Sequence, residues 1–205
     1  MNITKHALPA YSLSRDGEWA TIVVAPQVQD GRQGGLLMVE SSFGNFAYSW
    51  SSCGMDFRKF LSKISLNYFA QKVRGHDAEV FDDEASSQAI LHRLDQVRNA
   101  ILAGEHPGLT LADIEIDLKE ITAFCEEIHA FSAYPPQMIM AFEQLSLEHP
   151  DLFEGLPEYC IKTKLDPQVE QFWTTFWPAL IHVLNEELAE ACPDGKPVSR
   201  KPGVW

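Results

Sequence analysis

The chain has 205 residues, of which 45% are hydrophobic and 11% aromatic, and this is enough for one domain with its own core, or for one domain plus a lobe. It contains no apolar run near the ~18 residues of a membrane span, and its first residues lack the apolar segment of a signal peptide. These properties exclude a membrane-spanning protein, and we expect a soluble protein of the cytoplasm that does not bind membranes.

The net charge of −13 is unevenly distributed along the sequence. Residues 1–75 contain 8 Lys and Arg against 5 Asp and Glu, whereas residues 76–205 contain 8 against 24. The second part therefore carries −16, a charge that repels nucleic acid and attracts basic protein surfaces. Solubility alone is the alternative explanation. The four cysteines lie far apart without a CxxC pair, so we expect neither a disulfide framework nor a cysteine zinc site.

A first hairpin is predicted near the N-terminus. The dipeptide Asp16-Gly17 suits a type I′ turn, which aligns Tyr11 with Ile22 and puts the apolar side chains on one face. Pro9 cannot donate a backbone hydrogen bond, so we expect the first strand at the edge of the sheet. The following segment PQVQDGRQGG is expected to be a flexible loop.

A second hairpin is predicted from the segment VESSFGNFAYSW, residues 39–50, which alternates apolar and polar residues and changes phase in the middle. A two-residue turn at Gly44-Asn45 explains the change, because it aligns Val39 with Trp50 and gathers the aromatic side chains on one face. A bulge in one long strand is the alternative, and it divides those side chains between two faces. The two hairpins together predict a four-stranded antiparallel sheet with one apolar face.

The rest of the chain is predicted to be helical. Asp56 suits the N-cap of a helix that ends at Gly75 and covers the apolar face of the sheet. The strongest helical pattern follows Asp166, with Pro167 in its first turn, a wide apolar band, and a kink expected at Pro178. Further helices are expected over residues 83–104, 111–131 and 137–147.

These elements predict an α+β fold, in which an N-terminal four-stranded antiparallel sheet of two hairpins is packed by helices and followed by a helical, acidic C-terminal half. We expect a single domain over residues 1–205. Within it, residues 1–75 form the sheet and its covering helix, 76–192 the helical part, and 193–205 a polar tail.

The sequence carries no nucleotide-binding, hydrolase or metalloprotease motif. Cys125 and His129 have the i,i+4 spacing of metal ligands, but no third ligand accompanies them, and a buried cysteine beside a half-exposed histidine is favoured. The carboxylates Asp82, Asp83 and Glu84 suit acid–base or Mg²⁺ chemistry, and they suit the N-terminus of a helix more simply. We therefore predict no catalytic residue, no metal and no cofactor.

Four acidic residues of the expected helix over 111–131 are the predicted partner-binding residues. They are Asp113, Asp117, Glu120 and Glu127. Their spacing of i, i+4, i+7 and i+14 puts them on one side of the helix, away from its apolar stripe. A solvated helix face is the structural alternative for each of them taken singly.

Several segments taken together resemble small accessory proteins of tailed phages and prophages. These are SSFGNFAYSW, CGMDFRKFL, NYFAQKVRG and the C-terminal pattern P-x-V-x-x-F-W-x-x-x-W-P-x-L, which cover about residues 19–75 and 166–190. The motifs are structural, so the resemblance transfers no catalytic residue. It implies a product made in the cytoplasm of an infected bacterium, in a class that includes inhibitors of host defence such as anti-CRISPR proteins.

The leading hypothesis is therefore a phage-encoded, non-catalytic binding protein that inhibits a host protein with a basic surface. A nucleic-acid-binding defence complex such as CRISPR–Cas is the expected target, and direct nucleic-acid binding is not expected. Two alternatives stay open: an enzyme with a carboxylate site around residues 82–84, and a phage structural or assembly protein. A homodimer through a surplus apolar face is a further option, and closed symmetry would favour the assembly protein.

Overall fold

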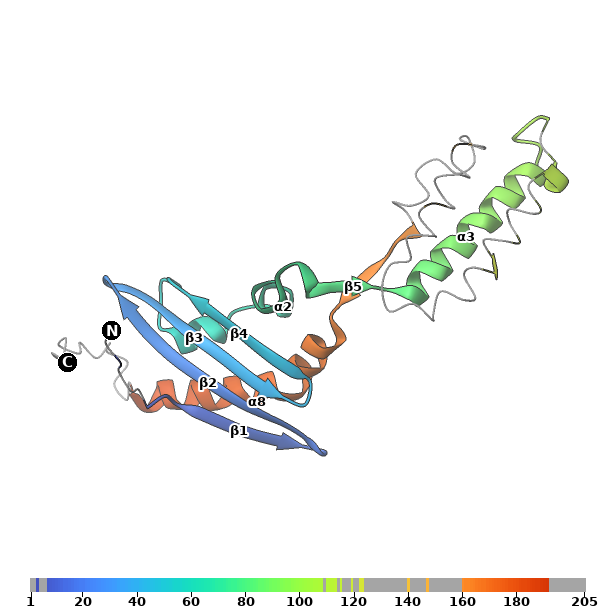
Figure 1. The fold of residues 1–205 in the computed structure, drawn as a ribbon. Coiled ribbons are helices and arrows are strands. Elements are labelled where there is room, and N and C mark those ends of the chain that lie inside the picture. The colour runs from blue at the N-terminus through green and yellow to red at the C-terminus, as the bar shows by residue number, and fades with distance from the viewer. Residues whose placement is uncertain are drawn as a thin grey trace. The chain divides into compact units, whose positions relative to one another are not determined.

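The chain forms two compact units, each built from both strands and helices. The computed structural model describes Ile3 and residues 7–108, 110–113, 115, 119, 122–123, 140, 147 and 160–191. Unit 1 comprises Met1–Ala78 and Leu165–Trp205, and unit 2 comprises Glu79–Lys164. The α+β class predicted from the sequence is confirmed (Figure 1).

Unit 1 contains a four-stranded antiparallel sheet in the order β1-β2-β3-β4. The strands are β1 (Ala10–Arg15), β2 (Glu18–Gln29), β3 (Arg32–Ser41) and β4 (Gly44–Trp50). Consecutive strands pair with one another, so the sheet is a meander, and β1 lies at its edge as predicted.

Two Asp-Gly turns connect the first three strands. The turn at Asp16-Gly17 has the positive φ angles of a type I′ turn, 52° and 89°, and Tyr11 pairs with Ile22 as predicted. The flexible loop expected after β2 is wrong, because Asp30-Gly31 forms a second turn with φ angles of 50° and 75°. Strands β2 and β3 therefore continue to Gln29 and Arg32 and form one long hairpin.

The turn between β3 and β4 lies two residues before the predicted position. Ser41 pairs with Gly44 and Val39 with Phe46, so Ser42 and Phe43 form the turn and the predicted pairing of Val39 with Trp50 is wrong. Gly44 follows the turn with a φ of 118°, a conformation that glycine adopts without strain. The predicted apolar face is nevertheless correct, because this register still puts the apolar side chains of β3 and β4 on the same side of the sheet.

Two short helices replace the single helix predicted over 56–75. Helix α1 (Phe57–Leu61) begins at the N-cap Asp56, and α2 (Leu66–Arg74) has Ser65 as its own N-cap. The Ser65 hydroxyl oxygen accepts a hydrogen bond from the backbone of Tyr68, and this cap favours a new helix start over continuation of α1. Gly75 ends α2 as predicted, and the 3-10 turn Gly75–Ala78 follows.

The C-terminal helix α8 (Pro167–Ala191) completes the core of unit 1 and runs across one face of the sheet (Figure 1). It is continuous through Pro178, and its first turn is capped by Asp166, which accepts a hydrogen bond of 2.8 Å from the Gln168 backbone. We expected this helix within the helical half, whereas it packs on the sheet with α1 and α2. The buried core consists of Ala20, Ile22, Val24, Leu37, Val39, Phe46, Trp50, Phe57, Leu61, Phe69, Ala70, Ala78, Val169, Phe172, Phe176, Trp177, Leu180 and Leu184.

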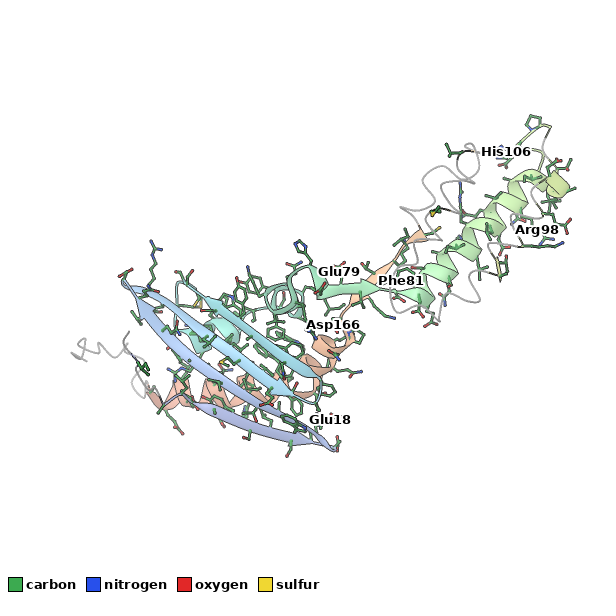
Figure 2. The ribbon with its side chains drawn as sticks, viewed as in Figure 1. Glu18, Glu79, Phe81, Arg98, His106 and Asp166 are labelled. Carbon is green, nitrogen blue, oxygen red and sulfur yellow. The ribbon has the colours of Figure 1, made fainter. Side chains whose placement is uncertain are left out.

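Unit 2 begins and ends with a two-stranded sheet of β5 (Glu79–Phe81), whose end residues are labelled in Figure 2, and β6 (Thr163–Leu165). Helix α3 (Asp83–Leu102) follows β5, and its predicted apolar stripe is buried at Ile90, Leu94, Val97 and Ile101. The buried Ser86 hydroxyl accepts a 2.9 Å hydrogen bond from the backbone of Lys162, which fixes α3 to the returning chain. Within 111–123, the described residues are helical.

Candidate functional site

The charge of the protein is concentrated in unit 2. Unit 1 contains 11 Lys and Arg against 12 Asp and Glu, a net charge of −1. Unit 2 contains 5 against 17, a net charge of −12. The sequence-based division at residue 76 counted α8 with the acidic half and gave +3 against −16. Assigning α8 to unit 1 narrows the difference in net charge, but unit 2 still carries nearly all of it. Within unit 2, residues 105–158 hold 12 acidic residues and a single basic one, Lys119.

Of the four predicted partner-binding residues, the structure describes Asp113. Its side chain is exposed, and its Oδ2 atom accepts hydrogen bonds of 2.7 Å from both the backbone N–H and the hydroxyl of Thr110. The Asp113 backbone N–H donates to the Thr110 carbonyl at 3.1 Å. The bond from the Thr110 N–H to the Asp113 carboxylate is one half of a capping box at the start of a helix, so Asp113 has a structural role that its predicted binding role did not include. Asp117, Glu120 and Glu127 lie outside the described residues.

The carboxylates at residues 82–84 lie at the junction of β5 and α3. Asp82 is the N-cap of α3, since its Oδ1 atom accepts a 3.2 Å hydrogen bond from the backbone of Ala85. The same atom lies 3.4 Å from Lys164 Nζ, and Asp83 Oδ1 lies 3.6 Å from it. Desolvation lowers the pKa of Lys164, but hydrogen bonds and charge from the two carboxylates outweigh it and leave that pKa raised. The arrangement favours helix capping and ion pairing.

A second cluster of polar side chains joins three elements of unit 1, and sequence analysis did not identify it. The Tyr11 hydroxyl on β1 donates to the Glu187 carboxylate on α8 at 2.9 Å. Arg58 of α1 lies 3.7 Å from Glu187 and 3.2 Å from Asp56. Burial, then the hydrogen bond to Glu187 and its charge, raise the pKa of Tyr11 to about 12. Desolvation raises the pKa of Asp56, but Arg58 outweighs it and lowers that pKa.

The basic residues of the first helical segment are largely used within the fold. Arg74 Nε lies 2.8 Å from Asp166 Oδ2, and the guanidinium lies 5.0 Å from the ring centroid of Phe46. The Lys72 ammonium lies 5.4 Å from the ring centroids of both Tyr48 and Tyr68, within cation–π range. These contacts tie α2 to β4 and α8, and they favour a stabilising role over phosphate binding.

The described residues contain no group of three or more metal-ligating side chains. Cys53 and Cys160 are free thiols, and burial raises the pKa of each. Cys125 and His129 lie outside the described residues. The i,i+4 pair His182 and Glu186 is an exposed surface pair with a separation of 3.3 Å.

The structure thus defines an α+β protein whose antiparallel meander is covered by helices. The acidic unit 2 is inserted in the sequence between Ala78 and Leu165 of unit 1. A family model described as a phage family matches residues 1–186, and the chain belongs to that phage family. No curated protein and no solved structure matches the chain. The resemblance to phage proteins is confirmed at this level. In the described part of the chain, no helix has both the length and the apolar character needed to cross a bilayer.

Proposed function

We propose that this phage protein is a non-catalytic binding protein that inhibits a host protein through the acidic surface of unit 2. Its target would be a nucleic-acid-binding defence complex, such as CRISPR–Cas, in the cytoplasm of the host bacterium. The target would offer a basic groove, and unit 2 would occupy it in place of nucleic acid, without itself contacting nucleic acid.

The observation that carries this proposal is the division of charge between the units. Solubility requires a net charge but no particular position for it, whereas here −12 of the total −13 falls on the 86 residues of unit 2. Proteins that bind nucleic acid carry clustered Lys and Arg, and the charge of unit 2 is complementary to such a cluster. Unit 1, at −1, then serves as the scaffold.

The contacts of the acidic residues around α3 support a binding role over a catalytic one. Asp82 caps α3 and pairs with Lys164, as Asp83 also does. A general acid or a metal-binding pair needs carboxylates directed at a substrate or an ion. These two are directed at a helix terminus and an ammonium of the same unit.

The test begins with a pull-down from host lysate, followed by binding measurements with the purified partner at low and high salt. A triple reversal of Asp117, Glu120 and Glu127 to Lys should weaken binding at least ~10-fold, because it removes long-range attraction and charge-assisted contacts. Asp113 is left unchanged, since its loss would also remove the capping box at Thr110. Wild-type affinity should fall as salt screens the exposed charges.

A matched control makes the same change of charge on unit 1. Glu170, Glu186 and Glu190 lie on the exposed side of α8, and their reversal to Lys alters the net charge of the protein equally. If the acidic surface of unit 2 is the binding site, the control retains most of the affinity. Salt-independent binding, or equal losses for both triple variants, would refute the proposal.

A further inference from the structure

The sheet of unit 1 has a second face, opposite the one that α1, α2 and α8 cover. Its side chains alternate along each strand with the core residues, and the strand register aligns them in rows. One row runs across all four strands and consists of Ala10, Val23, Met38 and Ala47. We call this surface the open face.

The open face combines exposed apolar side chains with small polar ones, chiefly serine, threonine and asparagine, and carries few charges. Trp19 on β2 and Met38 on β3 each expose 45% of their surface, and Ala47 on β4 is also exposed. Along the paired strands, this face carries two charged residues, Glu40 and, at the far end of β3, Arg32, which is paired with Gln29. Aromatic side chains and methionine are enriched, and charged ones depleted, at the centres of protein–protein interfaces.

The charge distribution favours a second copy of the chain as the occupant over a partner with a basic surface. A protein with a basic surface is attracted to unit 2, and the open face offers it one carboxylate. Two copies that met through unit 2 would oppose −12 to −12, whereas the open face belongs to a unit of −1. Identical neutral faces can pack on each other about a two-fold axis, as two sheets pack in a sandwich.

The size of the face predicts the strength of this contact. Four strands about 4.8 Å apart and about 24 Å long present roughly 450 Å² per copy, or about 900 Å² in total. Stable interfaces bury about 1,200–2,000 Å², and transient ones bury less. We propose that the open face associates with the same face of a second copy into a weak, reversible dimer. This proposal does not depend on the proposed function.

Sedimentation velocity tests the dimer over about 1 to 300 μM, a range that covers transient interfaces of this size. The wild type should pass from monomer to dimer within it. Met38→Glu should weaken association at least ~10-fold, because two-fold symmetry buries the new charge twice. Leu102→Glu is the control, since it makes the same charge change at a residue of α3 that is 66% exposed. It should leave dimerisation unchanged.

Salt separates this surface from the acidic one. Dimerisation should be unchanged or strengthened at high salt, because screening reduces repulsion between the acidic units, whereas partner binding should weaken. Ala47→Glu, on the neighbouring strand, should reproduce the loss, and thermal melting verifies that both variants are folded. A wild type that stays monomeric at about 300 μM, or a dimer that Leu102→Glu weakens as much as Met38→Glu does, would overturn the proposal.

Discussion

Unit 1 should fold without unit 2, because both of its segments contribute to one core and the chain leaves and re-enters at neighbouring positions. The Asp166 backbone N–H donates to the Ala78 carbonyl at 2.9 Å. At the other end of this strand pair, the Asp82 N–H donates to the Lys162 carbonyl at the same distance. Residues 83–161 can therefore be replaced by Asn-Gly, which forms a two-residue turn between the paired Asp82 and Lys162.

The magnitude follows from loop closure. A loop of 79 residues becomes a loop of two, and (3/2)RT ln(79/2) gives at most about 3 kcal/mol of added stability. Fixing the short turn offsets part of this gain, so we expect a free energy of unfolding equal to that of unit 1 in the full chain or up to about 3 kcal/mol higher. The net charge of the shortened chain is −1.

Urea unfolding followed by tryptophan fluorescence measures this quantity, since the core contains Trp50 and Trp177. The shortened chain should unfold in one cooperative transition with the near-ultraviolet circular dichroism of packed aromatic side chains. A non-cooperative transition, or loss of that signal, would show that unit 1 depends on unit 2. Either result would refute the inference that unit 1 folds alone because the chain leaves and re-enters it at neighbouring positions.

Three further predictions concern single residues of unit 1. Gly35→Ala should lower the free energy of unfolding by about 1–3 kcal/mol, because the new Cβ would overlap the Phe57 ring; adding Phe57→Leu should restore part of the loss in chemical denaturation. Gly44→Val should cost about 1–3 kcal/mol, since φ is 118° and the new Cβ would lie 3.2 Å from Gln168 Oε1; a melting temperature equal to wild type contradicts it. The pKa of Tyr11, raised to about 12, implies stability that is complete below pH 10 and lost as pH rises through 12. After allowance for solvent screening the loss should be about 1 kcal/mol, and Tyr11→Phe should flatten this part of a stability–pH profile.

The sequence predicts the composition of the sheet faces better than the register of the strands. Gly44-Asn45 and Ser42-Phe43 differ as turns, yet both registers put Val39 and Phe46 on the same side. Period-two alternation determines which side chains share a face of the sheet. The position of the turn depends on local backbone conformation, and a glycine is compatible with more than one turn position. The prediction of one apolar face was therefore correct although the turn was misplaced.

The long hairpin of β2 and β3 shows where alternation fails as a signal. Asp30-Gly31 is the same dipeptide as the correctly predicted Asp16-Gly17, and it forms the same kind of turn. The ends of these strands extend beyond the core, so their side chains are polar or exposed, as Val28 is at 75%. Without a buried face no alternation is required, and the Asp-Gly dipeptide was the remaining evidence for the hairpin.

Sequence analysis predicted neither the position of α8 nor the structural role of Asp113. The position of α8 depends on tertiary contacts, whereas the role of Asp113 depends on local hydrogen bonds. The apolar band of α8 predicts a buried helix, but periodicity does not tell which surface covers it. Phe172 lies 5.4 Å from Phe46 and 5.9 Å from Phe69, measured between ring centroids, and these contacts link segments more than 100 residues apart. The capping box, in contrast, could have been found from the Thr-x-x-acid pattern of Thr110 and Asp113.

The closure of the core by α8 sets an order for folding during synthesis. The ribosome completes the sheet and the whole of unit 2 before it adds Val169, Phe172, Phe176, Leu180 and Leu184, which the core of unit 1 needs. Until those residues emerge, the aromatic face of the sheet lacks its largest cover, while the intervening unit has all of its own residues. Unit 2 is therefore synthesised in full before the core of unit 1 can close, and the uncovered aromatic face makes the incomplete chain most prone to aggregate during that interval.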